Sequence, residues 1–210
     1  MANSTSITYR LKRKILTFTD KISRSASAPD RKFIADMVYG ILASKSCLLT
    51  DIVDQLHEPA QKINSVDRLS GHLKKGIPAS VSVSYLQTVK KMIPPDPIVL
   101  IDESDVVKPE GKQFESLGIV RDGSESTRTK NVYKKGYHVT EACALTATKH
   151  PVSIFSRIHS SAEKDYKSVN TITFDAIRQA AALFGKATFV MDRGYDDNKI
   201  FLMLDRLKQD

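Results

Sequence analysis

The segment Pro94-Pro95-Asp96-Pro97 constrains the fold of this chain more than any other stretch of its 210 residues. Proline fixes φ, lacks a backbone N–H and disfavours helical backbone in the residue before it. Three prolines in four residues therefore end any helix and force extended backbone. The patterns before this segment are helical, whereas strands and helices alternate after it. We expect a helical domain over residues 1–95 and an α/β domain over residues 96–210.

Apolar residues recur at three- and four-residue spacing throughout the first part, as in amphipathic helices. The expected helices cover residues 7–24, 30–45, 50–56, 65–75 and 82–93. Ser65 is a candidate N-cap for the fourth of them, and Gly76 is placed to end it.

Basic residues cluster on two of these helices. Arg10 and Arg13 lie on the first, and Arg68, Lys74 and Lys75 lie on the fourth. The first is either a DNA-contacting helix or an ordinary surface helix. The third and fourth could form a helix-turn-helix with its recognition helix near residues 65–75, although any three-helix bundle has a similar pattern. The net charge of +8 and the pI near 9.4 favour an anionic partner, with double-stranded DNA the leading candidate.

Two apolar runs in the second part each stop at an aspartate. The run Ile98–Ile101 precedes Asp102, and the run from Ala187 to Met191 precedes Asp192. Each run is typical of a strand buried on both faces, where a terminal charge is costly unless it is paired. Either aspartate alone could simply cap a turn. Two at matching strand ends indicate a divalent-metal site.

The order of elements supports this pairing. Further strands are expected at residues 137–146 and 151–158, joined as a hairpin, while residues 114–120 could pack partly as a ribbon. Helices are expected at residues 169–184 and 198–208. Three strands followed by a helix, a strand and a helix indicate a ribonuclease-H-like α/β fold with a mixed sheet. A right-handed crossover places the fourth strand beside the first and brings the two aspartates together.

Magnesium suits such a site, because it prefers hard oxygen ligands and retains several waters, and Mn²⁺ is a possible substitute. Two ions can activate an attacking oxygen and stabilise a leaving one in phosphodiester chemistry. We assign Asp102 the bridging role and Asp192 a single ion. Lys108 and Arg193 are candidate phosphate ligands, with charge balance for the carboxylates as the alternative.

Neighbouring side chains receive structural interpretations. Asp105 is expected at the strand end, facing away from Asp102. Glu103 is expected to be solvated or in a local ion pair. Tyr195 is either a core residue or a base-stacking one. The five histidines share no ligand spacing.

Composition excludes several other classes. No apolar run approaches the length of a membrane-spanning helix, and the N-terminus lacks the apolar core of a secretory signal. The two cysteines, Cys47 and Cys143, have no metal-type spacing and are expected to be reduced thiols in a cytosolic protein.

The segments 99–108 and 189–201 resemble the DDE transposases of bacterial insertion sequences, of the cut-and-paste type. The first is similar to the family's Asp-x-Ser/Thr motif and the second to its Asp-Arg motif, while segments 135–139 and 156–160 are similar to its intervening strands. The resemblance implies a ribonuclease-H-like domain in which Asp102 and Asp192 are catalytic metal ligands. It also implies magnesium-dependent cleavage and joining of DNA at transposon ends. Members act as homo-oligomers on terminal repeats and target DNA, in the bacterial cytoplasm and on the nucleoid.

The chain departs from the family pattern in one respect. The family has a third acid, a glutamate on a helix well downstream of the second aspartate, whereas this chain stops at Asp210 and Glu163 precedes Asp192. We expect a truncated copy or a fragment whose sheet is incomplete at the C-terminus. A non-catalytic DNA-binding or regulatory remnant is the alternative. A metal-dependent nuclease of the same fold would need its remaining acids within the chain.

Overall fold

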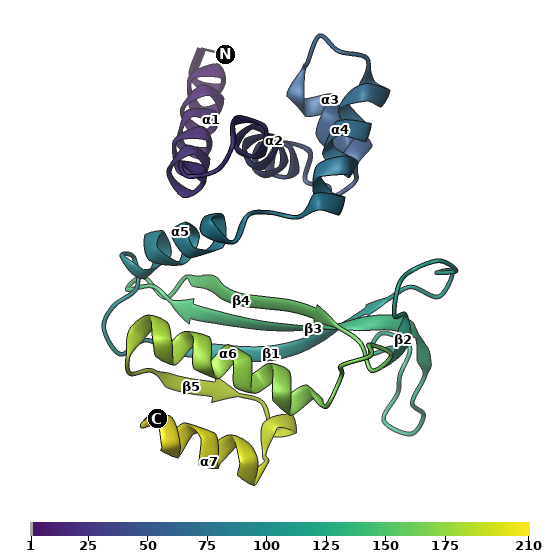
Figure 1. Cartoon of the computed structure of the whole chain (residues 1–210), viewed down its shortest axis with the longest axis vertical. Coiled ribbons are helices and arrows are strands. Elements are labelled where there is room, and N and C mark those ends of the chain that lie inside the picture. Colours follow the sequence, from purple (N-terminus) through teal and green to yellow (C-terminus); the bar gives the residue numbers. More distant parts are fainter. Residues whose placement is uncertain (1) are drawn as a thin grey trace. The chain divides into compact units, whose positions relative to one another are not determined.

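The computed structural model describes residues 2–210, with side chains described from residue 8 onward (Figure 1). Its contacts divide the chain into two compact units, residues 1–88 and residues 89–210. This division lies near the proline-rich segment at which the sequence predicts a boundary. Each unit is described by itself below.

The first unit consists of helices. They are α1 (Ala2–Ser23), α2 (Ala28–Ser44), α3 (Leu49–Leu56), α4 (Lys62–Lys75) and α5 (Ala79–Lys90), which crosses the division between the units. Their apolar faces enclose a core made of Ile22, Phe33, Ile34, Ile52, Val53, Leu69 and Val81. The spacing of these residues is the helical spacing found in the sequence, so helix burial follows from the pattern.

Local signals set the ends of these helices. Ser27 caps α2 by accepting a hydrogen bond from Asp30 N, and Lys45 ends it in a left-handed conformation. The expectation that Ser65 caps α4 is wrong, because α4 begins at Lys62, after Gln61. Ser65 is instead buried inside the helix, where its hydroxyl donates to Glu58 at 2.8 Å.

The second unit is an α/β structure built on a five-stranded mixed sheet. Its strands are β1 (Ile98–Val107), β2 (Gly118–Arg121), β3 (Tyr133–Leu145), β4 (Pro151–His159) and β5 (Thr188–Met191). The path through the sheet is β2-β3-β1-β5, and β4 also pairs with β3. β3 is antiparallel to both β1 and β4, whereas β5 is parallel to β1. The predicted hairpin and the predicted adjacency of the first and last strands are therefore confirmed.

β1 differs from the expected strand in two ways. It is buried on one face only: Val99 and Ile101 are almost fully buried, while Ile98 and Leu100 are 44% and 36% exposed. It also continues through Asp102 to Val107, because β3 supplies hydrogen-bond partners along that whole length. Asp102 and Asp105 thus lie within the strand, not at its end.

Helices α6 (Val169–Phe184) and α7 (Asn198–Leu207) complete the unit, with the short 3₁₀ helix η1 (Arg193–Tyr195) before α7. In Figure 1, α6 crosses the sheet, and it contacts β4, β3 and β1. Its buried side chains, such as Ala176 and Ile177, cover the face that carries Val99 and Ile101. The last residue of the chain pairs with β5: Asp210 N donates to Ala187 O, and Phe189 N donates to Asp210 O.

Within residues 2–210, no single helix is long and apolar enough to span a membrane. The pair α2 and α3 reaches that composition only when both are counted together, across a bend of 98°. Cys47 and Cys143 are both free thiols.

Candidate metal centre

Asp102 and Asp192 come together because of the register between β1 and β5. The two parallel strands pair Ile98 with Thr188 and continue to Ile101 with Met191. Asp102 is the next residue of β1, and Asp192 directly follows the last residue of β5, so the two lie at neighbouring positions where β5 ends. This is the placement that the sequence predicts for them.

Each of these carboxylates is oriented by one backbone N–H group. Glu103 N donates to Asp102 Oδ1 at 2.9 Å, and Gly194 N donates to Asp192 Oδ1 at 2.7 Å. Both residues are exposed. One oxygen of each carboxylate therefore has a fixed direction, while the other is open to an external ligand. Two hard oxygen donors with room for waters suit Mg²⁺ or Mn²⁺.

A third acid, Glu141, lies on β3 directly opposite Asp102 of β1 in the antiparallel register. Directly opposite residues share a face of the sheet, and like charges there repel. A cation bound near Asp102 would relieve this repulsion. Sequence reasoning missed Glu141, because the segment around it has no motif and its partner is known only once the strand register is known.

Two other acids of β1 face the side covered by α6. Glu103 and Asp105 both approach His138, whose Nδ1 lies 3.2 Å from Glu103 Oε1 and 2.9 Å from Asp105 Oδ1. These distances suit an ion pair, although the geometry does not give a hydrogen bond. Glu103 and Asp105 thus lie beside the same histidine ring, and each forms an ion pair with it when the ring is protonated.

The cluster of Glu103, His138 and His159 is partly buried. The side chain of His159 is fully buried, and its Nε2 lies 2.8 Å from Thr140 Oγ1 and 3.7 Å from Glu103 Oε2. Burial lowers the pKa of His159, with a smaller contribution from His138. Burial also raises the pKa of Glu103, as do the nearby charges of Asp105 and Asp102, although His138 opposes the change. The histidines lack sequence spacing because strand pairing, not helix periodicity, brings them together.

Tyr195 follows Asp192 in η1 and is only 9% exposed. This burial supports its interpretation as a core residue, since a buried ring cannot stack on a DNA base. Within the described residues its hydroxyl has no hydrogen-bond partner.

The two candidate phosphate ligands lie in different places. Arg193 directly follows Asp192 and is exposed, so it lies beside the aspartates. Lys108 follows the end of β1, six residues beyond Asp102. At about 3.3 Å per residue the separation is roughly 20 Å. Lys108 therefore cannot share a phosphate with Asp102, and its proximity in sequence is misleading.

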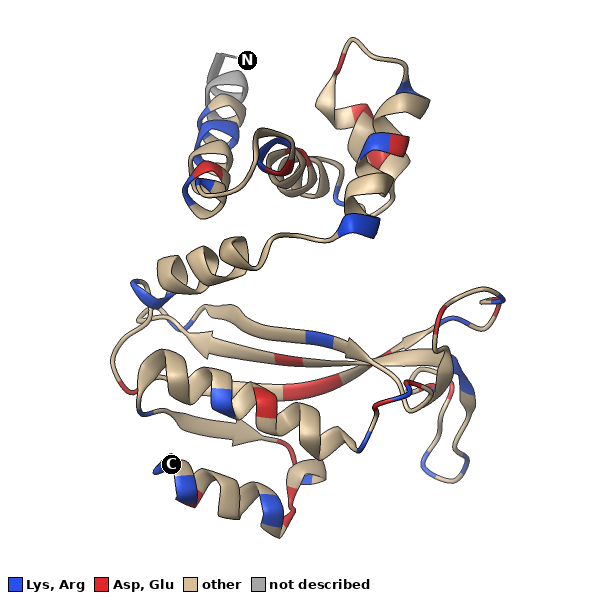
Figure 2. Ribbon diagram, viewed as in Figure 1, with Lys and Arg blue, Asp and Glu red and all other residues tan. Residues whose placement is uncertain are grey.

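The candidate DNA-binding residues of the helical unit fall into two groups. Arg10 and Arg13 are exposed on α1, and Lys74 is exposed on α4. Arg68 instead forms ion pairs with Asp36 at 2.8 Å and Glu58 at 2.9 Å, and Lys75 pairs with Asp30 at 2.8 Å. These two basic groups are therefore paired with acids of the same unit, although the Lys75 side chain is 60% exposed. Figure 2 shows blue segments along α1.

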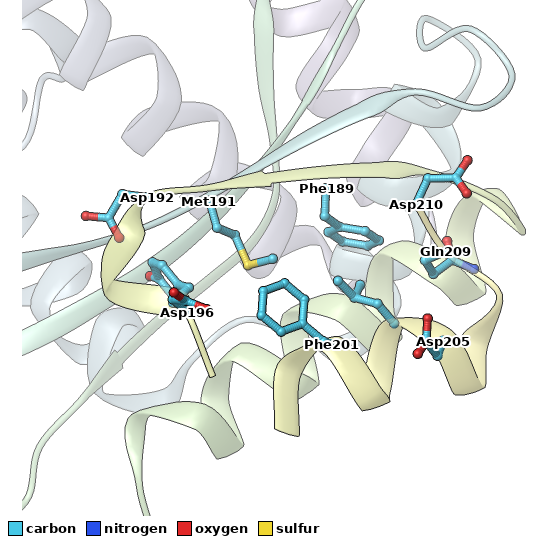
Figure 3. Close-up of a pocket in the computed structure, with 10 residues that line it drawn as sticks. Phe189, Met191, Asp192, Asp196, Phe201, Asp205, Gln209 and Asp210 are labelled. Atoms are coloured by element: carbon cyan, nitrogen blue, oxygen red, sulfur yellow. The ribbon is translucent and has the colours of Figure 1, made fainter. Parts of the chain in front are cut away.

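A pocket of about 440 Å³ lies beside Asp192, between β5 and α7. In Figure 3, Phe189, Met191 and Phe201 point into it, and Asp192 lies at one end. Besides these apolar side chains, four aspartates line the pocket: Asp192, Asp196, Asp205 and Asp210.

Among residues 2–210, no three or more histidine, cysteine or acidic side chains are already arranged to hold a metal ion. The candidate centre rests on two aspartates at neighbouring positions of the sheet, whose carboxylate oxygens are of the type that Mg²⁺ prefers. In comparisons with known proteins, no family model matches the chain. No curated protein matches it either.

Proposed function

We propose that this chain is a DNA transposase of the DDE type, with metal-dependent phosphodiester chemistry on a ribonuclease-H-like domain. The observation that carries the proposal is the register of β1 and β5, which makes Asp102 and Asp192 neighbours. Further support comes from the order of the sheet, in which an antiparallel set is followed by a helix and a parallel strand beside β1.

The chain's own residues have distinct tasks in this proposal. Asp102 and Asp192 bind the cation through the oxygens that their backbone N–H partners leave open. Arg193 contacts a phosphate of the DNA beside them. Bound divalent cations supply activation of the attacking oxygen and stabilisation of the leaving one. The exposed basic side chains of Arg10 and Arg13 on α1 hold the DNA through its phosphates, as expected for binding to the terminal repeats of a transposon.

Nicking of supercoiled plasmid DNA by the full chain tests this proposal. We expect nicked product with Mg²⁺ or Mn²⁺, and at least a hundredfold less with Asp102→Asn or Asp192→Asn, since loss of a metal ligand removes several kcal/mol of stabilisation. Asp175→Asn is the matched control, because Asp175 is a surface acid of α6 paired with Arg178. Nicking that persists in both aspartate variants would contradict the proposal.

A DNA-binding protein without catalysis is the second candidate function. The exposed basic residues of α1 favour it independently of the aspartates. Salt-sensitive DNA binding by the full chain, with no metal-dependent nicking under any condition above, would select this candidate over the first.

A further inference from the structure

The hairpin of β2 and β3 carries basic side chains on the face of the sheet that bears Asp102. Asp102 lies opposite Glu141 on β3, and side chains alternate between the two faces along a strand. Every second residue of β3 counted back from Glu141 therefore shares that face, and this set includes Lys135 and Tyr133. Arg121 of β2 lies directly opposite Tyr133, so it belongs to the same face. All three of these hairpin residues are exposed.

The acids of this hairpin are paired on the opposite face. Lys134 lies between two residues of the Asp102 face and so points away from it. It forms ion pairs with Asp122, at 2.9 Å, and with Glu125. Arg121 and Lys135, in contrast, make no ion pair with any residue that the structure describes. The hairpin thus keeps its paired charges on one face and its unpaired positive charges on the other.

The loop between β2 and β3 presents two more basic side chains in a defined turn. Asp122 N donates to Val132 O at 2.8 Å, and nearer the tip Thr127 N donates to Lys130 O at 2.8 Å. Lys130 N donates in return to the Thr127 hydroxyl at 3.1 Å. Arg128 and Lys130 are exposed at this tip, and within residues 2–210 neither side chain forms an ion pair.

These four basic residues are called the hairpin surface: Arg121, Arg128, Lys130 and Lys135. Figure 2 shows blue segments at the end of the sheet where Figure 1 labels β2. Unpaired basic groups on a backbone that hydrogen bonds already hold lose little freedom when they bind an anion. A row of phosphates is the ligand that such a spread of single positive charges fits best.

The distance from the aspartates indicates which phosphates the hairpin surface can reach. Tyr133 lies eight residues along β3 from Glu141, the partner of Asp102. At about 3.3 Å per residue this separation is roughly 26 Å. A DNA duplex rises about 3.4 Å per base pair, so the surface lies roughly eight base pairs from a phosphate at Asp102. Contacts at this distance add affinity and fix the position of the duplex without touching the reacting phosphate.

We propose that the hairpin surface binds the phosphates of duplex DNA about eight base pairs from the candidate metal centre. The role rests on the proposed function, because it takes DNA as the partner. It adds a contact surface in the α/β unit to the basic residues of α1. The Tyr133 side chain, which is 62% exposed beside Arg121, can donate a further hydrogen bond to a phosphate.

Fluorescence anisotropy of a labelled duplex with the full chain, at several salt concentrations, tests the role. Arg121→Gln/Lys135→Gln should bind about tenfold or more weakly at low salt. The slope of log Kd against log salt concentration should fall by about 2, because each lost phosphate contact lowers it by about 1. Lys164→Gln/Lys167→Gln is the control of equal charge change, since both lysines are exposed outside the hairpin, and it should bind as wild type does.

Two further variants separate lost contacts from lost folding. Arg121→Lys/Lys135→Arg keeps both positive charges, so it should keep the wild-type affinity and salt slope. Arg128→Gln/Lys130→Gln changes only the loop tip, outside the paired strands. It should weaken binding in the same direction, and it gives the answer even if the first variant does not fold.

The failure of this role and the failure of the proposed function give different results. Wild-type affinity in both glutamine variants of the hairpin, or equal losses in these variants and in the Lys164/Lys167 control, would overturn the role and leave the proposed function in place. If wild type does not bind the duplex even at low salt, both are wrong. Nicking that survives Asp102→Asn and Asp192→Asn, with binding still lost in the hairpin variants, overturns the proposed function alone.

Discussion

Gly194 shows how single residues set the geometry of the candidate metal centre. Its N–H orients Asp192, and a Cβ placed on it would lie 2.9 Å from Asp192 Oδ1. This is shorter than ordinary carbon–oxygen contact, so Gly194→Ala must displace the carboxylate. We expect about tenfold weaker Mn²⁺ binding, comparable to the loss of other groups that orient ligands, with little change in melting temperature. Gly123→Ala is the control, since its Cβ meets nothing within 4 Å, and equal losses in both variants would contradict this account.

Asp122 gives a prediction about pH. Hydrogen bonds from Ser124, the ion pair with Lys134 and backbone N–H groups lower the pKa of Asp122 to about 2, from 3.8. A lowered pKa means that the folded state favours the charged form, so the stabilisation is complete above the unfolded value and is lost as pH falls toward 2. We expect Asp122→Asn to lower the melting temperature at pH 7 and to lose this difference near pH 2. A difference independent of pH would show that the charge is not responsible.

The sequence singles out the two aspartates, but it does not show which residues of the neighbouring strands lie opposite the residues of β1. Asp102 and Asp192 stand out because each follows an apolar run. Glu141 and His138 do not, because their roles depend on which β1 residue lies opposite them. The unpaired hydroxyl of Tyr195 likewise depends on tertiary burial, which no local pattern encodes.

At the level of elements, β3 pairs with three other strands, and at Gly136 atoms of the neighbouring strands approach its backbone closely. Gly136 pairs with Val107 of β1 and with Gly118 of β2. A Cβ on Gly136 would lie 2.5 Å from Val106 O and 2.6 Å from Val120 Cγ2. The carbonyl cannot move without disturbing β1, so we expect Gly136→Ala to destabilise the protein by about 1–3 kcal/mol. Urea unfolding measures this, with Gly123→Ala as control; unchanged stability would mean that β1 and β3 separate easily here.

The elements themselves were largely predictable, and the exceptions have physical causes. Helix α6 has the expected bounds, because its apolar spacing and Gly185 define it locally. The second half of β1 was not expected, since Asp102–Asp105 is polar and has no strand pattern. It is a strand because β3 pairs with it, so tertiary hydrogen bonding overrides local propensity.

At the scale of the whole molecule, DNA binding is expected to depend on the exposed basic side chains of α1. We expect Arg10→Glu/Arg13→Glu to weaken binding of duplex DNA by the full chain, with a shallower salt dependence, because each lost phosphate contact lowers the salt slope by about 1. Fluorescence anisotropy at several salt concentrations measures both effects. Lys164→Glu/Lys167→Glu is the control of equal charge change, and an equal loss there would indicate that only net charge matters.

The mixed sheet was predictable from the order of patterns after the proline-rich segment. The exposure of one face of β1 could not be predicted, because four consecutive branched apolar residues hide the alternation of buried and exposed positions. Ile98 and Leu100 resemble core residues in sequence, yet they lie on the exposed face.

The most direct test of the central claim is a double-mutant cycle on Mn²⁺ affinity with Asp102→Ala, Asp192→Ala and the double variant. If both carboxylates bind the same cation site, each single variant should lose most of the affinity, and the double variant should lose little more, because the effects of residues sharing one ligand are not additive. Affinity that is unchanged in either single variant, or losses that simply add, would contradict a shared metal centre at the end of β5.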